Sequence, residues 1–77
     1  MSYYVTRLSL KELNEEEKQK LMEALEYCRL HDKTGEFNYM LTENAAYITS
    51  KTREQALKRG YYFKKKHKTH FSIIKEV

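Results

Sequence analysis

Cysteine and histidine are the residues of this chain whose type and spacing could support metal binding or nucleophilic catalysis. Two pairs have the two-residue separation that zinc sites use, Cys28 with His31 and His67 with His70. Cys28 and His31 could also form a thiol and imidazole pair. Structural zinc sites with so few cysteines are uncommon, and a cysteine on the apolar side of a helix is more simply a small buried group. The sequence therefore predicts no metal, no cofactor and no catalytic residue.

The sequence lacks the signals that are typical of several other classes of protein. The chain contains two glycines and no glycine-rich loop that could cradle a phosphate group, so we predict that it is not an enzyme. No apolar run approaches the ~20 residues that a membrane span needs, and the first residues lack a basic and apolar secretion signal. We expect a cytoplasmic protein that does not bind membranes, with a single domain over residues 1–77.

Positive charge is concentrated in the last third of the chain. Residues 1–50 contain six Lys or Arg against nine Asp or Glu, a net charge of −3, whereas residues 51–77 contain nine against two, a net charge of +7. Such a segment attracts phosphate backbones through counterion release, and the same field would steer an acidic protein surface. The alternative meaning of the run from Lys64 to Lys66 is a solvated helix face that keeps the protein soluble.

A strand and a helix are predicted in the first half of the chain. Tyr3 to Leu8 is rich in β-forming residues and has no turn residue. Asn14 followed by three glutamates is typical of a helix start, because Asn can cap free N–H groups and Glu17 can complete a capping box. The apolar stripe of this helix consists of Leu21, Met22, Leu25 and Cys28. After the helix, Gly35 can take the left-handed conformation.

A hairpin, a second helix and a final strand follow. Residues 37–42 and 45–49 have strand-like patterns, with the turn at Glu43 and Asn44. Thr52 can cap the second helix with Gln55 as its capping-box partner, and residues 69–77 form the last strand. The order β-α-β-β-α-β predicts an α+β, ferredoxin-like split βαβ fold, in which a four-stranded antiparallel sheet carries both helices on one face.

Gly60 distinguishes this fold from an alternative. A glycine inside a helix costs about 1 kcal/mol relative to alanine, and glycine equally well ends a helix. If the helix ended there, Thr42 to Thr49 would be an additional short helix, Thr52 to Arg59 a recognition helix and Tyr61 to Ile74 a β-wing. Together these elements give a winged helix-turn-helix. The segment from residue 45 to 50 is too short for the additional helix and turn. The ferredoxin-like fold is therefore preferred.

Two of the predicted strands resemble motifs of RNA-recognition (RRM) domains. Residues 3–8 are similar to the RNP2 motif, which runs aliphatic, aromatic, aliphatic, any residue, Asn, Leu, and the chain departs from it at Arg7. Residues 46–48 with Ala56 partly resemble the RNP1 core and the alanine that packs behind it, whereas Glu43 and Ser50 differ from that motif. The resemblance implies a ferredoxin-like fold and a role in binding RNA.

The same resemblance implies a role for two tyrosines. In RRM domains the middle aromatic residues of the two motifs stack on bases at the open face of the sheet, and Tyr4 and Tyr47 occupy these positions here. Strand alternation predicts that both rings face away from the core and that Val5 and Ile48 face it. Packing between strands, or a dimer face, is the alternative role of these tyrosines.

These patterns together predict a small non-enzymatic protein that binds nucleic acid, with tyrosines for unpaired bases and cations for phosphates. The candidate binding residues are Tyr4, Arg7, Tyr47, Lys58, Arg59, Tyr62, Lys64, Lys65, Lys66 and Lys68. The alternative is a protein-binding module or inhibitor, of the kind that phages and mobile elements encode, which acts on an acidic surface of a host protein or forms a homodimer.

Overall fold

The computed structural model describes residues 3–76, which fold into two helices and four strands. The elements follow the chain in the order β1 (Tyr3–Ser9), α1 (Glu15–Leu30), β2 (Asn38–Leu41), β3 (Ala45–Ser50), α2 (Arg53–His67) and β4 (Phe71–Glu76). Neither helix of this described range is long and apolar enough to cross a membrane. The predicted order of strands and helices is confirmed.

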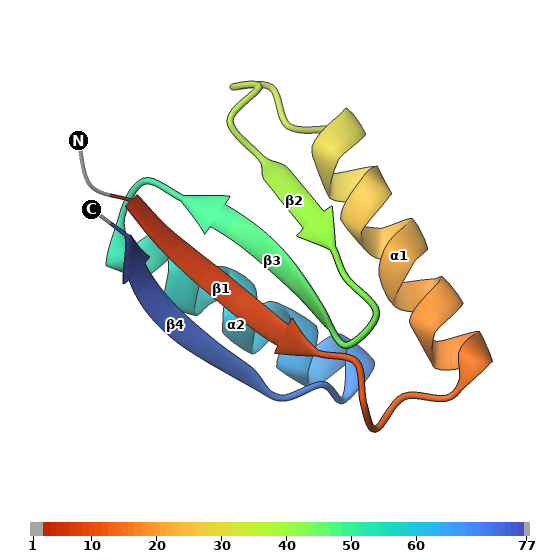
Figure 1. Ribbon diagram of the computed structural model, residues 1–77. Coiled ribbons are helices and arrows are strands. Elements are labelled where there is room, and N and C mark those ends of the chain that lie inside the picture. Colours follow the sequence, from red (N-terminus) through yellow and green to blue (C-terminus); the bar gives the residue numbers. More distant parts are fainter. Residues whose placement is uncertain (1–2, 77) are drawn as a thin grey trace.

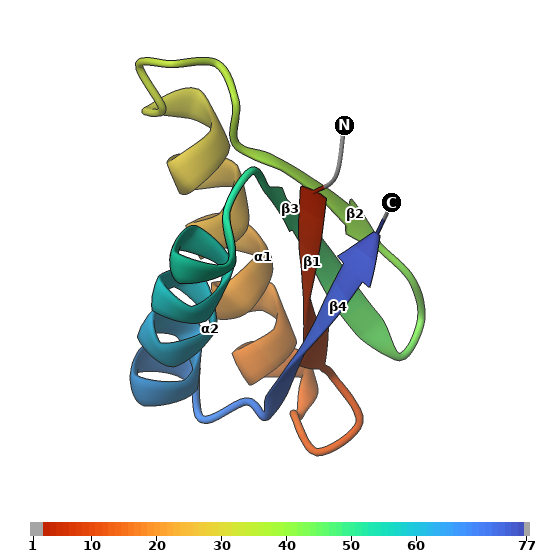
Figure 2. The ribbon, with the colours of Figure 1, turned by 90° about the vertical axis from the view of Figure 1, so that its left-hand side faces the viewer.

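The four strands form one antiparallel sheet in the order β2-β3-β1-β4. Figure 1 shows β1 between β3 and β4, with β2 at the edge near α1. Both helices lie on the same side of the sheet (Figure 2), so within residues 3–76 no helix covers the other side. Helix α2 contacts β1, β3 and β4, whereas α1 contacts β2 and α2. This is the ferredoxin-like α+β architecture that the sequence predicts.

Side chains along each strand alternate between a face covered by the helices and an open face. Thr6 of β1 lies opposite Ile48 of β3, and both residues are fully buried beneath the helices. The next residue, Arg7, lies opposite Tyr47, and both are half-buried on the open face. The register therefore assigns each described strand residue to one of two surfaces.

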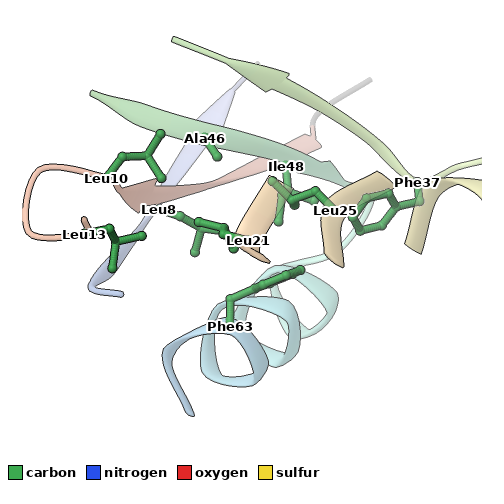
Figure 3. Packing of buried hydrophobic residues seen from close by; sticks show 9 residues of the cluster. All are labelled: Leu8, Leu10, Leu13, Leu21, Leu25, Phe37, Ala46, Ile48 and Phe63. Carbon is green, nitrogen blue, oxygen red and sulfur yellow. The ribbon is translucent and has the colours of Figure 1, made fainter. Parts of the chain in front are cut away.

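The hydrophobic core fills the space between the sheet and the helices. Its buried residues are Leu8, Leu10, Leu13, Leu21, Leu25, Phe37, Ala46, Ile48 and Phe63. Figure 3 shows the Phe63 ring of α2 directed toward side chains of α1 and β3. Full burial of each such leucine or phenylalanine contributes about 1.5–3 kcal/mol. Met22, which belongs to the predicted apolar stripe, is 40% exposed, because Leu21 and Leu25 occupy the centre of the buried side of α1.

Both helices begin where the sequence predicts. The Asn14 side chain accepts from Glu17 N at 2.8 Å, and Glu17 accepts from Asn14 N at 2.9 Å, which completes the capping box. Thr52 Oγ1 accepts from Gln55 N at 3.2 Å, but Gln55 Oε1 accepts from Lys51 N rather than from Thr52 N. Thr52 therefore caps α2 as predicted, but the second bond of the predicted capping box runs to the N–H of the preceding residue, Lys51.

Gly60 lies inside α2 and is buried. The helix continues past it to His67, and Lys68 caps it in the left-handed conformation with φ 53°. A Cβ at position 60 would lie 2.8 Å from Phe71 Cγ and closer still to two other ring carbons. The glycine therefore permits the close approach of β4 to α2. The winged helix-turn-helix alternative is wrong, because residues 45–50 form a strand and the first half of the proposed wing, residues 61–67, belongs to α2.

Candidate nucleic-acid interface

Tyr4 and Tyr47 lie on opposite faces of the sheet, so the prediction that both face away from the core is wrong for Tyr4. Tyr4 lies opposite Ser50 and shares the helix-covered side with Thr6. Thr6 occupies that buried position because its Oγ1 donates to the carbonyl oxygen of Ala56 in α2 at 2.9 Å. Because Thr6 is polar, the sequence pattern of β1 indicated that Val5 faces the core. In the structure Thr6 faces the core, and Val5 therefore lies on the open face.

The open face of the sheet carries little charge. Among the strand residues whose side chains are described, Arg7 is the one ionisable cation or anion on this face, next to Tyr47. Several neighbours are apolar and accessible: Met40 is 67% exposed, Tyr3 is 42% exposed and Ile74 is 40% exposed. This surface could stack on a ring or pack on another protein, but its described side chains offer a single cation, Arg7, to a phosphate backbone.

The predicted site residues therefore divide between two sides of the molecule. Arg7 and Tyr47 belong to the open face of the sheet, while the remaining cations lie on or just after α2, which covers the opposite side (Figure 2). The residues on this second side are Lys58, Arg59, Tyr62, Lys64, Lys65, Lys66 and Lys68. One short stretch of nucleic acid cannot contact both groups without passing around the edge of the sheet.

Arg59 is tied into the fold. Its Nη1 donates to the carbonyl oxygen of Thr49 at 3.0 Å and to Ser50 Oγ at 2.8 Å. Its guanidinium carbon also lies 4.9 Å from the centre of the Phe37 ring, within the range of a cation–π contact. The residue is half-buried. These contacts make Arg59 a support of the junction between α2 and β3, with little freedom to follow a phosphate.

The solvent side of α2 combines lysines with two exposed tyrosines. Tyr62 lies four residues from both Lys58 and Lys66, and Tyr61 lies four residues before Lys65, so these side chains are neighbours on the helix surface. Tyr61 is 60% exposed and Tyr62 is 49% exposed. We call this surface the basic aromatic face, and it consists of Lys58, Tyr61, Tyr62, Lys65 and Lys66. None of its lysines forms an ion pair with another side chain that the structure describes.

Both tyrosines of the basic aromatic face rest on a neighbouring ring. Tyr61 packs edge-on against Phe71, with ring centres 5.0 Å apart, and Tyr62 packs edge-on against Phe63 at 5.1 Å. Phe63 is 1% exposed, so Tyr62 is supported directly by the core. Rings held in this way lose little rotational freedom when a ligand stacks on them.

A shallow groove of about 520 Å³ runs beside this face, between α1 and α2. Tyr27 and His31 line the groove with their rings stacked and the ring centres 4.0 Å apart; the sequence did not indicate Tyr27, and it indicated His31 only as a metal-binding or catalytic partner of Cys28. Their four-residue spacing on a helix is the signal that could have identified them. Cys28 also lines the groove, and its pKa is raised because burial disfavours the thiolate. A protonated thiol is a poor nucleophile, so the pair of Cys28 and His31 gains no support.

The four possible zinc ligands lie in different surroundings. Cys28 and His31 line the groove, whereas His67 stacks on Phe63 near the end of α2 and His70 Nε2 lies 3.3 Å from a Glu12 oxygen. Within residues 3–76 no three His, Cys, Asp or Glu side chains are grouped so that they could hold a metal ion. The spacing pattern in the sequence is therefore not matched by a cluster in space.

Comparison with known proteins gives no match to a family model, to a curated protein or to a solved structure. The resemblance to RRM domains thus rests on residues 3–8, residues 46–48 and Ala56, and it stays a prediction. Many unrelated functions share the ferredoxin-like fold, so the fold alone assigns none of them.

Proposed function

We propose that this protein binds nucleic acid through the basic aromatic face of α2. The observation that carries the proposal is the arrangement of Lys58, Lys65 and Lys66 around the exposed rings of Tyr61 and Tyr62. Lysines at this spacing neutralise phosphates and release counterions, while tyrosine rings stack on bases regardless of sequence. The proposal assigns cations and rings to one helix, in place of the sheet face that the RRM resemblance implies.

Charge distribution supports α2 over the open face of the sheet as the phosphate-binding side. Helix α2 contains six Lys or Arg and a single Glu, whereas α1 contains three Lys or Arg and five Glu. The two helices lie in the same layer (Figure 2), so the field on this side changes sign from one helix to the other. A polyanion is attracted to α2 and repelled from α1, which orients it along the basic helix.

Fluorescence anisotropy with labelled 12-nucleotide strands and duplexes at low salt tests the proposal. We expect binding tighter than about 100 μM, which is the weak limit of typical non-specific affinity. The double variant Lys58→Ala with Lys65→Ala is expected to lose affinity at least about tenfold. The matched control is Lys11→Ala with Lys33→Ala, which removes the same charge from loops outside α2 and is expected to change affinity little. Equal losses in both double variants, or no binding by the unmodified protein, contradict the proposal.

A second candidate function is binding to a protein through the open face of the sheet. It is favoured by the accessible apolar side chains of Met40 and Ile74, which lie on a face that no helix covers. Capture from nuclease-treated lysate separates the two functions. A protein partner that is lost in Met40→Glu and kept in Lys58→Ala with Lys65→Ala supports the sheet face. Loss of all partners after nuclease treatment counts against it.

A further inference from the structure

The groove between α1 and α2 opens beside the basic aromatic face. Lys58 and Tyr62 line the groove and also belong to that face, so a polymer on the lysines passes over the groove opening. Its lining residues are Tyr27, Cys28, His31, Asp32, Phe37, Gln55, Lys58, Arg59, Tyr62 and Phe63. The groove is thus a recess within reach of the proposed phosphate track.

Aromatic side chains form much of the groove. Tyr27 of α1 stacks with His31, the residue that caps this helix, and their ring planes are inclined by 21°, while α2 supplies Tyr62. The His31 ring is fixed by its Nδ1, which lies 3.0 Å from the carbonyl oxygen of Tyr27. Buried rings of Phe37 and Phe63 lie behind them. Flat apolar surfaces from two helices suit a flat ring, and they are supported by core residues.

The polar groups of the groove suit an uncharged ring better than a phosphate. The pKa of Cys28 is raised by burial, so its thiol is neutral, and the cation Arg59 is already engaged by Thr49 and Ser50. The Asp32 carboxylate repels a phosphate, and its pKa is lowered chiefly by the hydrogen bond from Phe37 N. Lys58 is the exposed cation of the groove lining, and it belongs to the basic aromatic face. A base in the recess and its phosphate outside matches this distribution of charge.

We propose that the groove receives one unpaired base of a single-stranded nucleic acid while the flanking phosphates lie on the lysines of α2. This inference rests on the proposed function and adds a target class to it. Bases of a duplex are paired and stacked inside the helix, so they cannot enter the recess, whereas bases of a single strand can. The protein therefore prefers single strands to duplexes of the same length.

Tyr27 provides the test that separates this inference from the proposed function, because it lines the groove but lies outside the basic aromatic face. Tyr27→Ala is expected to weaken binding of a 12-nucleotide single strand by roughly tenfold, which is within the range for loss of one stacked base. The matched control is Met22→Ala, an exposed apolar residue on the same helix that does not line the groove. Because Tyr27 is 63% exposed, the variant is expected to fold, and thermal unfolding by circular dichroism verifies this.

An abasic strand of equal length provides the second arm, since it keeps every phosphate and lacks the bases. We expect Tyr27→Ala to leave binding of the abasic strand and of the duplex unchanged. A single strand that binds no better than the abasic strand or the duplex overturns the inference, and so does equal affinity of Tyr27→Ala and the unmodified protein. If the lysine variants still lose affinity in that case, binding of phosphates by the lysines of α2 stands without the base site.

The one cysteine of the chain gives a readout that needs no substitution. Cys28 lines the groove, so a base in the recess is expected to shield its thiol from alkylation by iodoacetamide. Mass spectrometry should show slower alkylation with a saturating single strand and an unchanged rate with the abasic strand. Equal rates with both strands contradict occupation of the groove by a base.

Discussion

Gly60 of α2 lies directly against the ring of Phe71 in β4, so that a Cβ at position 60 would lie 2.8 Å from Phe71 Cγ. Tyr61, the next residue, packs edge-on against the same ring from the solvent side. The close approach of strand and helix thus determines where the first tyrosine of the basic aromatic face stands. A glycine in mid-helix is unfavourable by about 1 kcal/mol relative to alanine, and this contact is the physical reason for its presence.

Gly60→Ala is expected to destabilise the protein. The added methyl group gains about 1 kcal/mol of helix propensity but must displace the whole Phe71 ring, and overpacking of this kind costs typically 1–3 kcal/mol. In a Phe71→Ala background the steric conflict is absent, so the same substitution is expected to stabilise. Urea unfolding of the four proteins gives both values. A destabilising effect of equal size in the two backgrounds would contradict the role assigned to Phe71.

The elements of the fold could be predicted because their signals are local. Asn14 and Glu17 are three residues apart and satisfy each other, and the hairpin turns at Glu43 and Asn44 as their composition indicates. The order of elements then restricts the topology to few possibilities. Gly60 left two topologies open, because a glycine can lie inside a helix or end it. Its role here depends on the contact with Phe71, which is eleven residues further along the chain.

The candidate site could be predicted only in part, because its geometry depends on contacts that are distant in sequence. The face of the sheet that Tyr4 occupies follows from the hydrogen bond between Thr6 and Ala56, which are 50 residues apart. Arg59 has the composition of a phosphate ligand, yet its partners Thr49 and Ser50 belong to β3. The lysines of α2 were identifiable from charge alone, whereas the groove exists only where α1 and α2 pack side by side.

Arg59→Ala is expected to reduce stability rather than to act as a simple loss of a phosphate contact. The substitution removes two hydrogen bonds to β3 and the contact with Phe37, and we expect a cost of about 1–3 kcal/mol. Lys65→Ala, on the solvent side of the same helix, is expected to stay within about 0.5 kcal/mol of the unmodified protein. Thermal or urea unfolding compares the two. Equal stability of both variants would argue that Arg59 is a surface cation like the others.

The hydrogen bonds to Glu26 predict a dependence of stability on acid pH. The Glu26 carboxylate accepts from Arg29 and from the Tyr39 hydroxyl at 2.5 Å, and these bonds lower its pKa from 4.5 to about 2. The folded state therefore favours the ionised form. The resulting stabilisation is fully present above pH 4.5, the ordinary value, and is lost as the pH falls from there toward 2.

Carbon-13 NMR titration of the Glu26 carboxyl checks this directly, and Tyr39→Phe is expected to raise the pKa because one of the two donors is lost. In urea unfolding, the stability difference between the unmodified protein and Glu26→Gln should shrink as the pH is lowered from 6 to 3. Glu23→Gln is the control on the same helix, because the Glu23 carboxylate accepts from Gln19, whereas Arg29 and Tyr39 donate to Glu26. A Glu26 carboxyl that titrates at its ordinary value would remove the basis of this prediction.

Salt dependence measures how many lysines of the basic aromatic face contact phosphates. With Lys58, Lys65 and Lys66 engaged, the plot of log K against log salt concentration for a single strand is expected to have a slope of about −2, since each phosphate contributes about −0.7. Lys65→Ala should weaken binding to all sequences alike and make the slope shallower by about 0.7, because one fewer counterion is released. Lys11 lies outside α2, so the variant Lys11→Ala is expected to keep the slope of the unmodified protein. If both variants give the same slope, the phosphates do not lie on this face, whatever the affinity at low salt.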